Sequence, residues 1–188
     1  FYSRETPLAP MDSPILTFTN DPVQARAMTR SDIRDMRRWH RNAALRAKRA
    51  GFDLVYVYGA HGFGVVQHFL SPKTNQRTDE YGGSLENRAR LLKELIEDTK
   101  DAVGDSCAVP VRILIDEMMG PAGITNSEIH DVVGMLGDLP DLWDFAHGSW
   151  DYCSATSRFA DEAHMEDKVR GLKALTSKPV VGVGRFTS

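Results

Sequence analysis

Segments with a helical hydrophobic period alternate four times with short runs of β-branched and aromatic residues, and this rhythm most restricts how the chain can fold. Apolar runs of this length are typical of strands buried on both faces of a parallel sheet. Strands that alternate with helices of ten or more residues imply right-handed crossovers and a parallel sheet. The pattern predicts strands at 52–58, 109–115, 142–147 and 179–183, each preceded by a helix, at 31–50, 85–103, 126–136 and 161–175.

Four helix–strand units make half of a (β/α)8 barrel, a fold that typically needs about 250 residues. Because the chain has 188 residues, we expect an α/β fold in which residues 1–188 form part of one TIM-barrel domain, roughly its strand 4 to strand 7 half. A small doubly wound sheet is the alternative, and its Rossmann form is disfavoured because no GxGxxG follows a strand. Residues 1–28 are predicted to be an irregular lead-in, and residues 29–188 to carry the four units.

The charge and the cysteines restrict the class of protein. The net charge of −3 and a pI near 6.1 argue against a nucleic-acid-binding surface. No apolar run approaches the roughly 20 residues that cross a bilayer, so no membrane span is expected. Cys107 and Cys153 lack CxxC spacing, which favours a reducing, cytoplasmic location. The first residues show neither an initiator methionine nor a signal peptide, which indicates a piece of a longer chain.

Polar side chains gather directly after the predicted strands, where parallel α/β folds bind their ligands. Arg112 lies inside the second strand, between two apolar residues. An unpaired buried charge costs several kcal/mol, so this guanidinium requires an anion. One interpretation is an ion pair with Asp116 or Asp144. The other is a fixed positive charge that stabilises negative charge on a bound cofactor or intermediate.

Three further positions suit a binding or catalytic site, although each also has a structural interpretation. His61, after the first strand, is a general base or hydrogen-bond donor at neutral pH, and Tyr58 would bond to it if the turn folds back. Trp150, in a loop, would attract a cation by its π face. Gly184 and Arg185, after the last strand, resemble a phosphate-binding loop, a weak signal alone. A metal-dependent hydrolase is a further alternative, because metal-ligand types are present, but their spacing matches no metal motif: His61, His68, Asp116, Glu117 and His147.

The stretch from Gln67 to Arg90, QHFLSPKTNQRTDEYGGSLENRAR, resembles the signature of the old yellow enzyme family of FMN-dependent barrels. The sequences YVYGAH (56–61), SRF (157–159) and GVGR (182–185) are similar to the branch with trimethylamine, dimethylamine and histamine dehydrogenases and N-methyl amine demethylases. The resemblance covers nearly the whole chain. It implies an FMN-binding TIM barrel and oxidation of an amine.

The resemblance also implies roles for individual residues. Arg112 would face the N1/O2 edge of the flavin, and Gly184 and Arg185 would help to hold its phosphate. Tyr58 and His61 match two members of the amine dehydrogenases' active-site triad, and Trp150 matches a wall of the aromatic bowl that holds the methylated ammonium. The third triad member is an Asp in the relatives, but here it is Cys153. Since a thiol cannot replace a carboxylate as an acceptor, Asp144 or Asp151 is an alternative partner, and the substrate is expected to differ.

We therefore expect an N-methylated amine or amino acid to be oxidised by hydride transfer to flavin N5, after which the iminium hydrolyses to an aldehyde and an amine. His147 is the expected contact for a carboxylate on the substrate. The alternatives are an NAD(P)H-dependent ene-reductase of the 2,4-dienoyl-CoA reductase type and an inactive barrel fragment. The resemblance implies an iron–sulfur cluster in the parent chain, whose cysteines are absent here. The electron acceptor and a homo-oligomeric state are left open.

Overall fold

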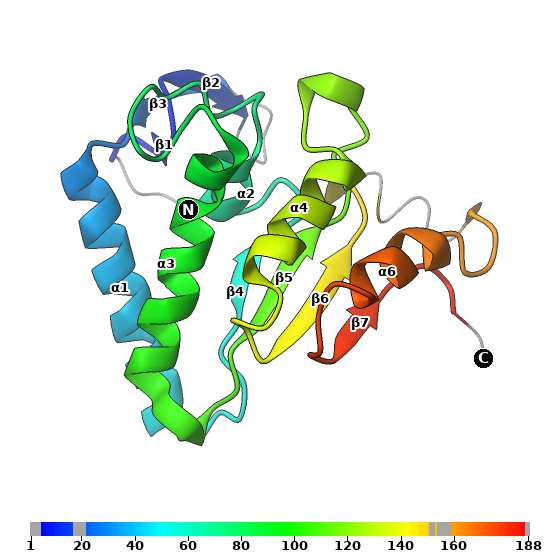
Figure 1. Ribbon diagram of the computed structural model, residues 1–188. Helices are drawn as coiled ribbons and strands as arrows, with labels where there is room; N and C mark the ends of the chain where they lie inside the picture. The colour runs from blue at the N-terminus through cyan, green and yellow to red at the C-terminus, as the bar shows by residue number, and fades with distance from the viewer. Residues whose placement is uncertain (1–4, 17–21, 151–152, 154–158, 187–188) are drawn as a thin grey trace.

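The structure, a computed structural model, describes residues 5–16, 22–150, 153 and 159–186. Its centre is a four-stranded parallel sheet in the order β4-β5-β6-β7, with β4 at Val57–Gly59, β5 at Pro110–Leu114, β6 at Leu142–Ala146 and β7 at Val180–Gly182. Helices α2 (Val65–Leu70) and α3 (Leu85–Val103) connect β4 to β5, α4 (Asn126–Leu136) connects β5 to β6, and α6 (Glu166–Lys173) precedes β7. Figure 1 shows these helices against one face of the sheet, and the predicted helix–strand order is confirmed.

The long helices begin at residues that satisfy their first N–H groups. At the start of α1 (Arg30–Arg49) the Thr29 side chain accepts from Asp32 N–H, and the Asp32 side chain accepts from Thr29 N–H. This arrangement is a capping box, and Thr125 and Glu128 form the same one at α4. Ser84 caps α3, which ends at Gly104 with a positive φ of 58°. The two predicted helices 85–103 and 126–136 match the structure in full, because apolar period and cap agree at both.

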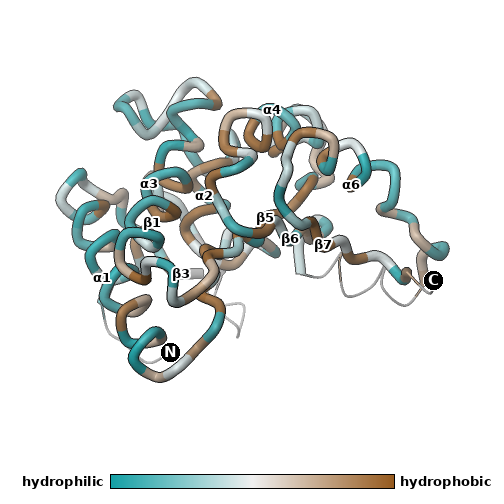
Figure 2. The backbone as a smooth tube through the Cα atoms, turned by 60° about the horizontal axis from the view of Figure 1, so that its bottom comes forward, coloured by the Kyte–Doolittle hydropathy of each residue, from teal (hydrophilic) through white to brown (hydrophobic). Residues whose placement is uncertain are grey.

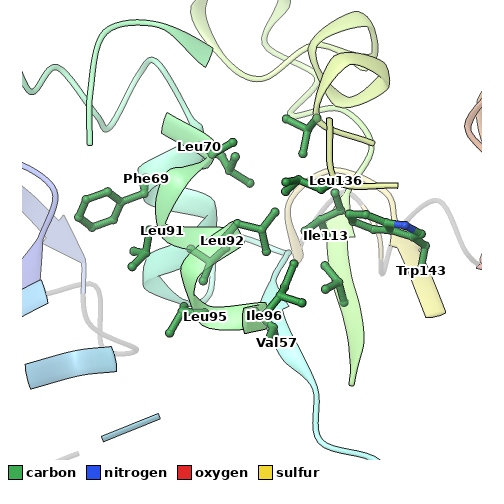
Figure 3. Close-up of a cluster of buried hydrophobic side chains, with 14 of the residues drawn as sticks. Val57, Phe69, Leu70, Leu91, Leu92, Leu95, Ile96, Ile113, Leu136 and Trp143 are labelled. Atoms are coloured by element: carbon green, nitrogen blue, oxygen red, sulfur yellow. The ribbon is translucent and has the colours of Figure 1, made fainter. Parts of the chain in front are cut away.

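The core lies between the sheet and the helices. Val57, Ile113 and Trp143 point toward this side (Figure 3). Leu92 and Ile96 of α3 lie near Val57 and Ile113, whereas Trp143 lies on the side of Leu136 of α4, and all of these side chains are buried. The Trp143 indole N–H donates to Gly137 O at 2.8 Å, so the largest buried side chain has its polar atom paired. In Figure 2 the tube is brown, and so hydrophobic, at β5 and along parts of α4.

Several segments differ from the sequence prediction, among them the fourth helix, which is predicted at 161–175 and observed at Glu166–Lys173. The segment expected to be irregular contains a second, three-stranded sheet of β1 (Leu8–Ala9), β2 (Ser13–Leu16) and β3 (Pro22–Ala27) in the order β1-β3-β2. These strands are too short, and in part too rich in proline and alanine, to give a period-2 signal. The strand predicted at 52–58 is regular only at Val57–Gly59. It is not buried on both faces, because four of its side chains are exposed: Phe52, Leu54, Tyr56 and Tyr58.

The lengths and compositions of the helices bear on membrane spans. Within the described ranges, none is both long and apolar enough to cross a membrane.

Candidate functional site

A row of polar side chains crosses the sheet face opposite the helices. In the parallel register Tyr58 of β4 pairs with Arg112 of β5, and Arg112 pairs with Asp144 of β6. Because side chains in register on neighbouring strands point to the same face, these three lie side by side, away from the apolar core. The predicted placement of Arg112 inside a strand is therefore correct, and the register adds Asp144 to the group.

His61 reaches Tyr58 through a tight turn at the end of β4. The Tyr58 hydroxyl lies 2.7 Å from His61 Nδ1, so the turn folds back as the sequence hypothesis required. His61 and Gly62 both have positive φ angles, 62° and 74°, which is uncommon for a residue with a Cβ. Gly59 permits the turn to pack, because a Cβ there would lie 2.7 Å from Val66 Cγ1.

The surroundings set the protonation states of the Tyr58–His61 pair. Burial raises the pKa of the Tyr58 hydroxyl, and the nearby Arg112 opposes this. Burial and Arg112 lower the pKa of the His61 imidazole, while Asp144 acts against them. At neutral pH the pair therefore consists of a neutral phenol and a neutral imidazole, which lets the phenol donate to Nδ1. Such a pair can pass a proton between a bound molecule and the imidazole.

The Arg112 guanidinium has an incomplete set of partners among the described residues. Arg112 Nη1 lies 3.5 Å from Asp144 Oδ2, and the Asp144 side chain is only 7% exposed. Arg112 Nε and Asp144 Oδ1 are buried without a hydrogen-bond partner in the described chain. Burial raises the pKa of the Asp144 carboxyl, and the Arg112 charge counteracts it. The ion-pair interpretation thus holds for Asp144 and is wrong for Asp116, which faces Lys168 Nζ at 3.5 Å.

These two orphaned atoms test whether a flavin fits this face. A bound group with a hydrogen-bonding edge would satisfy a buried donor and a buried acceptor that otherwise stay unpaired, which is costly. The isoalloxazine edge carries such acceptors and donors next to each other. The Tyr56 hydroxyl also acts on the Asp144 carboxyl and lowers its pKa, and the two buried atoms that stay unpaired in the described chain fit the edge of FMN.

Aromatic side chains stand beside the Tyr58–His61 pair. The Trp150 ring lies edge-on to His61 with 5.8 Å between ring centroids, and Phe63 lies 5.9 Å from Trp150. Trp150 is 54% exposed and Phe63 45%, so their faces are accessible to a ligand. The backbone N–H of Trp150 donates to His61 O at 3.3 Å, which fixes this loop to the turn. Phe63 was missed from the sequence, because an aromatic residue after a histidine turn carries no signal of its own.

The departure at Cys153 keeps the thiol near the pair. Cys153 N–H donates to Ser149 O at 2.8 Å. Burial raises the pKa of the Tyr58 hydroxyl, Arg112 lowers it, and the Cys153 side chain is a further group that raises it. Asp151, the other alternative partner for His61, lies outside the described residues. Asp144 is the carboxylate that acts on His61 within the described chain.

A second group of residues lies apart from the first, at the ends of β6 and β7. The His147 and His164 rings have centroids 5.5 Å apart, and burial, followed by Lys168 and His164, lowers the pKa of His147 to about 4. Gly184 has a φ of 134°, and a Cβ there would lie 2.8 Å from Met165 Cγ. The Arg185 guanidinium donates to Ala160 O. The structure thus places His147, Gly184 and Arg185 around the segment before α6 rather than around Tyr58.

The histidines and acids considered for a metal site are occupied in other ways. His68 Nε2 lies 3.2 Å from Gly62 O, and Glu117 accepts from Ser71 Oγ and from Ile124 N–H. Within the described ranges no three or more His, Cys, Asp or Glu side chains form a group that could hold a metal ion. The hydrolase alternative has no support there.

Comparison with known proteins identifies the family. Residues 3–188 match the model of the NADH:flavin oxidoreductase / NADH oxidase family. The chain belongs to this family of FMN-dependent oxidoreductases. It is 44% identical over 149 residues to dimethylamine dehydrogenase of Hyphomicrobium sp. (strain x), a match that covers 77% of this chain and 20% of that protein. It is also 35% identical over 142 residues to NADPH dehydrogenase of Clostridium acetobutylicum, covering 76% and 41% of the two chains.

Solved structures place the sheet in its fold. Histamine dehydrogenase from Rhizobium sp. 4-9 matches 100% of this chain, and 27% of its own, with a TM-score of 0.93 and 60% identity. The 6-hydroxypseudooxynicotine amine oxidase of Pseudomonas geniculata N1 matches 100% of this chain and 28% of its own, with a TM-score of 0.92 and 50% identity. The predicted fold is confirmed: the parallel sheet is part of an old yellow enzyme-like TIM barrel. The chain spans less than half the length of these relatives.

Proposed function

We propose that the protein containing this chain oxidises a methylated amine or amino acid with FMN as the hydride acceptor. The observation that carries the proposal is the meeting on one sheet face of Arg112, the Tyr58–His61 pair and the Trp150 ring. A fixed cation can stabilise the reduced flavin, a proton-transfer pair can deprotonate the amine, and an aromatic wall can hold its cation, so the three together suit amine oxidation by a flavin. The similarity to a dimethylamine and a histamine dehydrogenase supports an amine as the substrate class.

Arg112 provides the electrostatic part of the proposal. The chemistry that FMN supplies, when bound, is acceptance of a hydride. The Arg112 guanidinium would donate to the N1/O2 edge of the ring and stabilise the negative charge that arrives with the hydride. Asp144 holds Arg112 at the sheet face, and its orphaned Oδ1 would accept from the same ligand. Gly184 and Arg185 would face the phosphate of the cofactor.

Trp150 and Phe63 would hold the cationic amine before its oxidation. Their exposed faces offer cation–π attraction of about 0.5 to 2 kcal/mol each, depending on desolvation. The Tyr58–His61 pair would then take the ammonium proton, because the nitrogen lone pair must be free before the adjacent C–H bond can lose a hydride. Loss of that hydride leaves a C=N bond, and water converts the iminium to an aldehyde and the shortened amine. His147, a neutral ring near Lys168, would contact a carboxylate on an amino-acid substrate.

Anaerobic titration of the full-length protein tests this function. The flavin band at about 450 nm should bleach on addition of an N-methylated amine or amino acid without NADPH. Tyr58→Phe should slow this bleaching, since the phenol proton is lost from the pair. Tyr81→Phe is the matched control, because it removes a phenol hydroxyl that donates to Glu94 rather than to a residue of this site. A full-length protein that binds no flavin, or that bleaches with none of the amines, would exclude the proposal.

A second function is favoured by the NADPH dehydrogenases among the relatives. In this alternative the same Arg112 site would receive a hydride from NADPH and pass it to an activated alkene. Bleaching by NADPH alone, with no response to amines, would select it. For the parent protein, the proposal also includes an iron–sulfur cluster, a separate electron acceptor and a homo-oligomeric state.

A further inference from the structure

Gln67 in α2 lies between the turn that carries His61 and the loop that follows β5. Its side-chain oxygen accepts a hydrogen bond from Gly62 N–H at 2.7 Å, and its amide nitrogen donates to Glu117 Oε1 at 3.2 Å. Gln67 is only 5% exposed. A buried amide that uses its acceptor on one segment and its donor on another connects the two segments through bonds that water does not replace.

The turn requires such an external bond. His61 is a non-glycine residue at φ 62°, a conformation that costs about 1 kcal/mol or more and persists only where the surroundings hold it. The Gly62 N–H, directly after it, points to Gln67. On the other side, Trp150 N–H donates to His61 O at 3.3 Å. Of these two bonds, the one to Gln67 is shorter and comes from a buried side chain.

Glu117, which accepts a hydrogen bond from Gln67, is itself held in place by its other contacts. Its second oxygen accepts from the Ser71 hydroxyl at 2.6 Å and from Ile124 N–H at 2.7 Å. Gly123 packs against it so closely that a Cβ would lie 2.5 Å from Oε2. The carboxylate therefore cannot shift without breaking bonds to α2 and to the β5–α4 loop.

We propose that Gln67, held by Glu117, is a positioning residue that sets the His61 ring against the Tyr58 hydroxyl. The catalytic consequence rests on the proposed function, whereas the placement of His61 does not. Among the described residues, the charged groups that act on His61 are Arg112 from β5 and Asp144 from β6. A displacement of reacting groups by about 1 Å can lower a rate by roughly 100-fold, so loosening this turn affects turnover more than substrate binding.

Two variants separate positioning from general packing. Gln67→Met removes both hydrogen bonds while it keeps a side chain of similar length. The pair Gln67→Glu with Glu117→Gln exchanges donor and acceptor: the new carboxylate accepts from Gly62 N–H and from the new amide, whose oxygen still serves Ser71 and Ile124. Exposed Gln76, in the next loop, supplies the control Gln76→Met. Should Gln67→Met not fold, Gln67→Glu alone replaces it. This variant keeps an acceptor for Gly62 N–H but loses the bond to Glu117, because two carboxylates repel each other.

The experiment measures the pH dependence of His61 carboethoxylation in the full-length protein, residue by residue, with peptide mass spectrometry. In Gln67→Met, His61 should be carboethoxylated faster, and the pH at which its reactivity is half-maximal should rise. The exchanged pair should restore the wild-type rate and the wild-type midpoint. With an amine that bleaches the flavin, kcat should fall by about 10-fold or more with little change in KM. His61 reactivity equal to that of Gln76→Met, or an exchanged pair that restores nothing, would overturn the inference. Absence of bleaching in the wild type would remove the proposed function alone, because the His61 measurement still decides the placement.

Discussion

Arg88 gives the sharpest stability prediction, because it joins three helices through one buried guanidinium. Its side chain is 7% exposed, and it donates to Leu70 O at the end of α2 and to Glu128 Oε1, 2.5 Å away, at the start of α4. Arg88→Met should therefore destabilise the protein. Removing one partner of a buried pair costs about 3 to 5 kcal/mol. Because Glu128 is 26% exposed, water compensates part of the loss, and we expect about 3 kcal/mol.

The assay is thermal unfolding of the full-length protein, in which Arg88→Met should lower the melting temperature; the shift per kcal/mol decreases as the unfolding unit becomes larger. Arg90→Met, two residues further along α3, is the control, since Arg90 is less buried than Arg88 and donates to Glu80 O and to Asn87 Oδ1 without an ion pair. Adding Glu128→Gln to Arg88→Met should recover part of the loss by removing the unpaired carboxylate. Equal midpoints for Arg88→Met and Arg90→Met would refute the assignment of Arg88 as a buried connection.

Three further predictions follow from single positions. The His147 pKa falls from about 6.5 in the unfolded chain to about 4 in the folded one. Because the unfolded state binds the proton first, stability present above pH 6.5 is lost as the pH falls toward 4. His147→Gln should make the melting temperature less dependent on pH across this window, and an unchanged pH dependence would contradict the prediction. Gly134→Ala, at an exposed helix position with open space for a Cβ, should stabilise the protein by about 0.5 to 1 kcal/mol. Gly82→Ala should destabilise it, because the new Cβ would clash with Arg77 O. Thermal unfolding measures both, and the opposite order of melting temperatures would be inconsistent with this packing. Trp150→Leu should raise the amine KM by roughly 2- to 30-fold, as loss of about 0.5 to 2 kcal/mol implies, and steady-state kinetics with an unchanged KM would exclude the ring as an ammonium contact.

The order of elements could be predicted because their signals were local. The helices at 85–103 and 126–136 carry both a hydrophobic period and a cap, and the structure reproduces them. Helix α2 could not be predicted, since it has only six residues and begins at Gly64 with no side-chain cap. The strands before α1 depend on pairing with one another, which no local pattern encodes.

The site divides along the same line. Arg112 could be predicted from one charged residue in an apolar strand, and its neighbours Tyr58 and Asp144 follow from the register. Gln67 could not, because a glutamine among apolar residues carries no signal until the turn at His61 has folded onto it. The position of His147 could not be predicted either, because it depends on tertiary structure, which places the ring beside His164 rather than beside Tyr58. Its role stays a prediction, as do those of Gly184 and Arg185.

The midpoint potential of the bound flavin tests the central claim most directly. If the Arg112 guanidinium faces the ring, Arg112→Met in the full-length protein should lower the potential by roughly 40 to 60 mV, which for two electrons corresponds to about 2 to 3 kcal/mol of lost stabilisation of the reduced form. Arg112→Lys, which keeps the charge, should lie between the two. A potential in Arg112→Met equal to that of the wild type, with flavin still bound, would contradict the account.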